Sequence, residues 1–120
     1  MKKQLLIIAT LDTKGREAAY VKDCVQGRGI HPILMDVGTL GKPLAHPDIT
    51  CEEVVQAAGY HLNDLMKMKD RSVAIRAVQE GGAILAKRLY EEGKLHGLFG
   101  MGGGTGTAIV TYIMRSLPFG

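Results

Sequence analysis

The sequence has few aromatic residues and no tryptophan: two Phe and four Tyr among 120 residues. Proteins that bind single-stranded nucleic acid stack bases on aromatic side chains, so this composition argues against that class. Fifteen Lys and Arg against twelve Asp and Glu leave a net charge of only +3. Such an excess suits a small anionic ligand and is too weak for a nucleic-acid-binding surface. We therefore expect no nucleic-acid partner.

Cysteine is scarce, and long hydrophobic runs are absent. Cys24 and Cys51 are the two cysteines, and they form neither a CxxC motif nor a zinc-binding spacing. We expect two reduced, buried thiols, with Cys24 on the inward side of its helix. The apolar run near the N-terminus ends at Asp12, too early for a signal peptide, and no segment reaches membrane-spanning length. The sequence predicts a cytoplasmic protein with no membrane partner.

The remaining pattern is that of one compact α/β domain over residues 1–120, with 46% hydrophobic residues. Apolar runs predict strands at residues 4–10, 31–37 and 98–101, the last with a possible start at His96. Helical spacing predicts helices over 16–27, 50–58 and 70–93, and a last helix that includes Ala108, Ile109 and Ile113 and stops at Pro118. Residues 38–50 are expected to form a long loop, and residues 61–69 are left open between a helical turn and a flap. The β-α-β order with long crossovers predicts a Rossmann-like three-layer domain with a small parallel sheet covered by helices. By analogy with the flavodoxin-like arrangement, we expect the strand order 2-1-3. A fourth strand would come next in such a pattern, so we expect the N-terminal fragment of a longer protein.

Two local patterns refine this prediction. Thr50 and Glu53 form a capping box at a helix start. The Gly81-Gly82 pair lies inside a predicted helix, where each glycine costs roughly 1 kcal/mol in helix propensity. We expect close packing against a strand to compensate.

The strongest functional signal is the run GMGGGTGT at residues 100–107, placed where a strand meets a helix. Glycines let the backbone approach an anion closely, and free N–H groups at the helix start point toward it. The residues predicted to bind phosphate are Gly102, Gly103, Gly104, Thr105, Gly106 and Thr107. Two alternatives stay open: the threonines are helix N-caps, or the glycines form a tight turn for packing. The run contains neither GxGxxG nor a Walker A lysine.

A second candidate is the polar run TLDTKGRE at residues 10–17, which follows the first strand. It would place Asp12, Thr13, Lys14 and Glu17 at the carboxyl end of the sheet, where open α/β folds bind ligands. Lys14 can neutralise phosphate, and Asp12 can hold Mg²⁺ through water. The alternative is an Asx-type turn at Asp12 with Lys14 as a solvated charge.

Asp36 ends the second strand, where nucleotide-binding β-α-β units carry a ribose-binding acid. A capping role in the turn that follows fits this position equally well. The adjacent loop, residues 38–46, could cover a base or ribose. The run KMKDR at residues 67–71 reads as a solvated helix start, and the histidines show no metal-ligand spacing.

The runs TLDTKGRE, MDVGTLGKP, DITCEEVVQAAG, DRSVAIRAVQEGGA and GMGGGTGTAI occur in this order. Together they resemble the Tm-1-like ATP-binding family, also called UPF0261. The resemblance implies bound ATP with Mg²⁺, the glycine turn on phosphate and the TLDTKGRE loop beside it. It also implies dimers, a possible protein partner and a longer protein. The family turn more often reads GGSGGT, so this chain differs at one hydroxyl position.

Three functions are compatible with these features. We favour a nucleotide-binding module whose bound ATP supports protein–protein or interdomain contacts. The alternative is a fragment of a Mg²⁺-dependent phosphoryl-transfer or hydrolase enzyme, with Asp12 and Lys14 as its residues. A structural fragment that associates through its sheet edge is the third.

Overall fold

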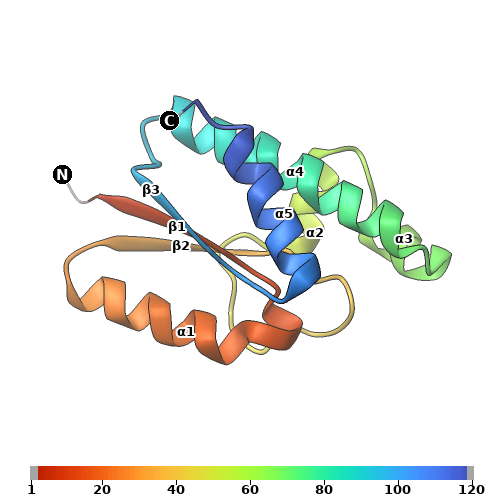
Figure 1. Ribbon diagram of the computed structural model, residues 1–120, viewed down its shortest axis with the longest axis horizontal. Coiled ribbons are helices and arrows are strands. Elements are labelled where there is room, and N and C mark those ends of the chain that lie inside the picture. The colour runs from red at the N-terminus through yellow and green to blue at the C-terminus, as the bar shows by residue number, and fades with distance from the viewer. Residues whose placement is uncertain (1–2, 119–120) are drawn as a thin grey trace.

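A computed structural model describes residues 3–118 of the chain (Figure 1). The elements follow in the order β1 (Gln4–Ala9), α1 (Leu11–Gly27), β2 (His31–Asp36), α2 (Cys51–Ala57), α3 (Leu62–Met68), α4 (Arg71–Glu91), β3 (Gly97–Met101) and α5 (Gly104–Arg115).

The three strands form one parallel sheet in the order β2-β1-β3, which confirms the predicted order. In the register, Leu5 of the central strand lies opposite Pro32 of β2 and Gly97 of β3. Because the strands are parallel, their carboxyl ends meet at one edge, and the loops after β1, β2 and β3 come together there.

Helices cover both faces of the sheet (Figure 1). Successive side chains of a strand point to opposite faces. Leu6 and Ile8 of β1 accordingly enter a core shared with α2, α4 and α5, whereas Ile7 and Ala9 pack with α1. The three-layer α/β architecture expected from the sequence is thus present. Within the described residues, no helix combines the length and apolar character needed to cross a bilayer.

The glycine pair inside α4 lets two other helices pack closely against α4. We had expected close packing against a strand. A Cβ at Gly81 would collide with the carbonyl oxygen of Val54 in α2, and one at Gly82 would lie 2.5 Å from Cδ1 of Ile113 in α5. A strand residue, Met35, also lies near that second position, with its Sδ 3.7 Å away. The helix α4 is therefore held against two neighbouring helices.

Several boundaries differ from expectation. Helix α1 begins at Leu11 rather than Arg16, with a kink at Lys14, because the polar run after β1 folds into a helical turn whose amides bond to the Thr10 carbonyl. Residues 62–68 form the helix α3. The long loop ends beside β2, where Asp36 N–H donates to the Ile49 carbonyl at 3.0 Å.

The two cysteines lie in different environments. Cys51 is buried as expected, whereas Cys24 is exposed, so the inward placement was wrong. With about 100° between successive helical residues, Cys24 lies about 90° from the centre of the stripe formed by Ala18, Val21 and Val25. The predicted capping box at Thr50 and Glu53 is present.

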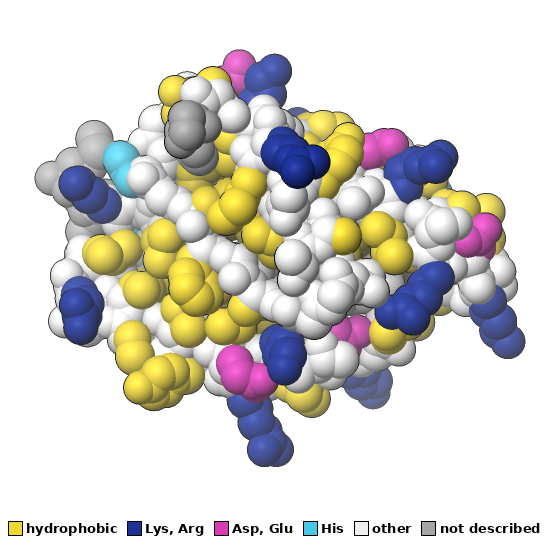
Figure 2. Space-filling view, in the orientation of Figure 1, with side chains coloured by type: hydrophobic (Ala, Val, Ile, Leu, Met, Phe, Trp, Pro, Cys, Tyr) yellow, Lys and Arg dark blue, Asp and Glu magenta, His cyan; other side chains and the backbone are white. Residues whose placement is uncertain are grey.

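The strand β3 lies at an edge of the sheet, paired with β1 among the described strands. Figure 2 shows hydrophobic side chains gathered on this face of the molecule, over the region of β3. The large apolar residues Phe99, Tyr112 and Met114 are each more than 40% exposed. The edge therefore combines free strand backbone with apolar surface.

Candidate functional site

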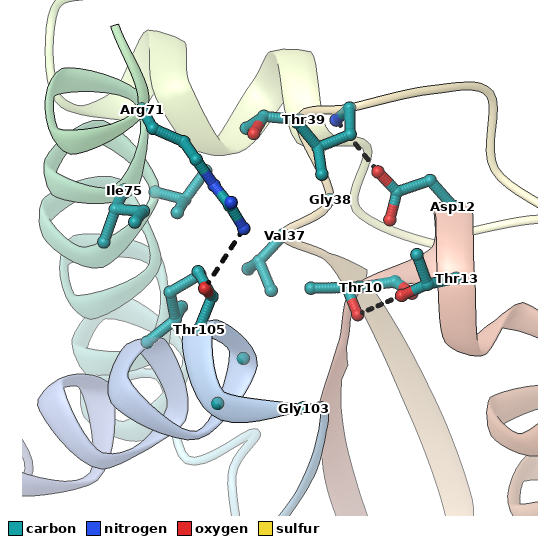
Figure 3. Close-up of a pocket in the computed structure, with 15 residues that line it drawn as sticks. Thr10, Asp12, Thr13, Val37, Gly38, Thr39, Arg71, Ile75, Gly103 and Thr105 are labelled. Atoms are coloured by element: carbon teal, nitrogen blue, oxygen red, sulfur yellow. Dashed lines mark hydrogen bonds between the residues drawn. The ribbon is translucent and has the colours of Figure 1, made fainter.

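A cavity of about 210 Å³ lies at the carboxyl end of the sheet. Its walls come from four places: the end of β1 with the start of α1, the loop 37–40, the first turns of α4, and the start of α5 (Figure 3). Ligands of open α/β folds bind at this edge. The predicted site residues on its walls are Asp12, Thr13, Gly103, Gly104, Thr105 and Gly106.

The start of α5 has free backbone donors. Gly103 is the N-cap residue and has no side chain with which to cap the helix, and its carbonyl accepts from the Thr107 amide at 2.8 Å. The first amides of a helix have no acceptor within it. The N–H groups of Gly104, Thr105 and Gly106 thus stand at the positive end of the helix dipole.

The glycines of the turn divide into two kinds. A Cβ at Gly102 would lie 2.7 Å from Cα of Gly106, so close packing requires glycine there. Added Cβ atoms at Gly103 and Gly104 would meet nothing within 4 Å. Neither residue has a positive φ. Glycine is therefore needed for neither packing nor a positive φ at these two positions, although Gly103 also suits the N-cap. At both positions it keeps the cavity wall free of side chains.

The two threonines of the turn do not cap α5, since Gly103 occupies the N-cap position. Thr107 donates its hydroxyl to the Gly103 carbonyl at 3.0 Å. Together with Gly102, it faces a shallow hollow on the other side of the turn. Thr105 lines the cavity and accepts a hydrogen bond at Oγ1.

Arg71 supplies the positive charge on the cavity walls, and sequence reasoning missed it. Its Nη2 donates to Oγ1 of Thr105 at 3.3 Å, so the guanidinium reaches from α4 toward the start of α5 (Figure 3). The sequence did contain a topological signal for this residue. Helix α4 leads into β3, which is parallel to β1, so α4 runs antiparallel to the strands. It therefore begins at the carboxyl edge of the sheet. Arg71 is the first residue of that helix.

The TLDTKGRE segment is only partly in the cavity. Oδ2 of Asp12 accepts from the Leu40 amide at 2.9 Å, and Thr13 shares a 2.9 Å hydroxyl contact with Thr10. Lys14 and Glu17 do not line the cavity; they form a 3.6 Å ion pair at the surface. The structure thus brings Asp12 and Thr13 to the glycine turn and leaves Lys14 and Glu17 apart.

Asp36 is a buried carboxylate behind the cavity, with 4% of its surface exposed. Its Oδ1 accepts from the amides of Leu11 at 3.1 Å and Gly38 at 2.8 Å. Burial raises the pKa of this carboxyl above the usual 3.8, the two hydrogen bonds oppose the rise, and the Asp12 charge adds to it. This geometry matches the capping role, because the carboxylate joins the loops after β1 and β2.

A metal at this site would rest on few protein ligands. Among residues 3–118 no group of three or more His, Cys, Asp or Glu side chains converges. Mg²⁺ is commonly bound through one or two carboxylates and the phosphates of its ligand. Asp12 is the carboxylate on the cavity wall that could serve in this way.

Comparison with known proteins places this chain in a family. Residues 3–120 match the family described as "Uncharacterised protein family (UPF0261) N-terminal domain". The UPF0261 protein of Clostridium tetani is 39% identical over 120 residues, covering the whole chain and 30% of that relative. The UPF0261 protein RA0729 of Rhizobium meliloti is 38% identical over 118 residues, covering 98% of the chain and 29% of the relative. The chain spans about three tenths of the length of these relatives, and it belongs to the UPF0261 family, matching its N-terminal domain.

Proposed function

We propose that this domain is a nucleotide-binding module that holds ATP with its phosphates at the start of α5. The observation that carries the proposal is the open wall at Gly103 and Gly104, where added Cβ atoms would meet nothing within 4 Å. At the N-cap, Gly103, glycine is favoured over alanine, whereas at Gly104, inside the helix, glycine lowers stability relative to alanine. A bound anion that approaches the backbone would explain why glycine is present at Gly104.

The chemistry around the open wall favours phosphate. The free amides of residues 104–106 and the Arg71 guanidinium all donate hydrogen bonds, and the helix dipole adds positive potential. On the opposite wall, Asp12 could hold Mg²⁺ jointly with the phosphates. Donors on one side and a carboxylate on the other fit a magnesium–polyphosphate complex.

The exposed edge of the sheet supports the interdomain part of this function. Half of the backbone groups of an edge strand are unpaired, and exposed apolar side chains are present on β3 (Phe99) and on α5 (Tyr112 and Met114). The longer relatives have further chain that could cover this edge. Slower amide hydrogen exchange in β3 of the full-length Clostridium tetani relative than in the 120-residue chain would support such a contact; equal rates would contradict it.

Thermal unfolding with and without excess ATP and Mg²⁺ tests nucleotide binding. A ligand at a hundredfold excess over its Kd adds about 2.7 kcal/mol to the free energy of unfolding. For a domain of this size we expect the Tm to rise by about 10 °C. Gly104→Val, which fills the open wall, should remove the rise. A folded chain whose Tm does not respond to ATP, or a variant that responds equally, would contradict the proposal.

A further inference from the structure

A second cavity, of about 330 Å³, opens between α3, the start of α4 and the loop after β2. Three residues, Thr39, Leu40 and Arg71, line both this cavity and the one at the glycine turn. The first cavity, at about 210 Å³, is smaller than the roughly 300–1,000 Å³ of typical small-molecule sites. A ligand with its phosphates on α5 therefore has room to continue past Arg71 into the second cavity.

The walls of the second cavity differ in character from those of the first. Leu40, Leu65, Met66 and Ala74 provide an apolar lining. Leu40 and Met66 are 67% and 50% exposed, so a group that covered them would remove apolar surface from water. The cations Lys69 and Arg71 also line the cavity, and its apolar side chains suit the faces of a flat, uncharged ring.

Asp70 is the acidic group in this cavity, and its hydrogen-bonding capacity is already used at Oδ1. That oxygen accepts from the Ser72 amide at 3.0 Å, the Ser72 hydroxyl at 2.7 Å and the Val73 amide at 3.4 Å. These bonds cap α4. The apolar walls therefore offer contact with the faces of a ring, and Oδ2 of Asp70 is the carboxylate oxygen left for its edge.

We propose that the second cavity holds the nucleobase of the ligand whose phosphates lie at α5, with Met66 and Leu40 against the ring. This inference rests on the proposed function and adds to it the place of the base. Apolar walls discriminate weakly between ligands that differ in polar substituents. ATP and GTP should accordingly bind with affinities within about a hundredfold of each other.

Calorimetric titration of the 120-residue chain with ATP and with inorganic tripolyphosphate, both with Mg²⁺, tests the assignment. ATP should bind at least about tenfold more tightly, equivalent to about 1.4 kcal/mol. Met66→Ser should remove most of this difference and leave tripolyphosphate binding unchanged. Met68→Ser is the matched control: Met68 is an exposed methionine of the same helix, 61% exposed, that does not line the cavity.

The outcomes separate this inference from the function on which it rests. Equal binding of ATP and tripolyphosphate, or equal weakening of both by Met66→Ser, would overturn the base site while the phosphate site stands. An effect of Met68→Ser as large as that of Met66→Ser would also overturn it. If a folded chain binds neither compound, the proposed function fails, and the base site with it.

Discussion

Replacement of Gly104 by alanine should make the protein more stable and its nucleotide binding weaker. Gly104 is the first residue of α5, its φ is not positive, and an added Cβ would meet nothing within 4 Å. Alanine can therefore occupy this position without strain. The methyl group would project into open space on the cavity wall, where we place the phosphates.

The size of the stability effect follows from helix propensity. Alanine is favoured over glycine by up to about 1 kcal/mol within a helix, and about 1 kcal/mol corresponds to a rise in Tm of about 3 to 5 °C for a domain of this size. A phosphate displaced from the helix start would lose charge-assisted hydrogen bonds, each contributing about 1.5 to 3 kcal/mol. We expect the Kd for ATP to rise at least about tenfold.

Two other glycines serve as controls. Gly27, at the end of α1, also has open space for a Cβ and lies outside the cavity, so Gly27→Ala should not change ATP affinity. A Cβ at Gly100 would collide with the side chain of Val110, so Gly100→Ala should lower the Tm. Scanning calorimetry and ATP titration of the three variants provide the measurements. A lower Tm for Gly104→Ala, or unchanged ATP binding by it, would refute the reasoning.

Three further predictions concern charged and thiol groups. Arg71→Gln should raise the Kd for ATP by about 10- to 100-fold in titrations, because it removes a charge-assisted donor; Arg76→Gln, on the same helix but outside the cavity, should have little effect. Asp36→Ala should lower the free energy of unfolding by about 2 to 4 kcal/mol in urea, because two buried amides lose their acceptor, whereas Asp36→Asn should cost less. The raised pKa of Asp36 means that the folded state binds its proton more readily than the unfolded state. The free energy of unfolding of the wild type should therefore fall relative to that of Asp36→Asn as the pH rises from 3.8 through the pKa of the folded state. A wild type that gains stability relative to Asp36→Asn over this pH range would contradict the prediction. With iodoacetamide at pH 8, exposed Cys24 should be alkylated quickly, whereas burial raises the pKa of Cys51 to about 12 and protects it; equal rates in mass spectra would refute the difference.

The fold could be predicted from the sequence because its signals are local. Short apolar runs, glycine stops and the capping box at Thr50 each act within a few residues, and the 2-1-3 order was expected by analogy with the flavodoxin-like arrangement. The glycine turn was found for the same reason. Its role in binding phosphate remains a prediction.

The rest of the site depends on contacts between distant segments. Arg71 reaches Thr105, 34 residues further along the chain, and Asp36 bonds to the Leu11 amide 25 residues earlier. No short sequence pattern encodes such pairs. Lys14 was expected to neutralise phosphate, but the helical turn after β1 directs it to Glu17 at the surface. The cation on the cavity wall is instead Arg71 of α4.

The hydrogen bonds of Asp36 have a consequence for the kinetics of binding. One carboxylate oxygen accepts hydrogen bonds from the amides of Leu11 and Gly38. Leu11 precedes Asp12 and Gly38 precedes Thr39, so two walls of the cavity are fixed relative to each other. These walls are preorganised, and a ligand need not spend free energy on ordering them. Association should then be governed by diffusion and charge rather than by closure of a loop. Differences in affinity among ligands should therefore appear mainly in how fast they leave.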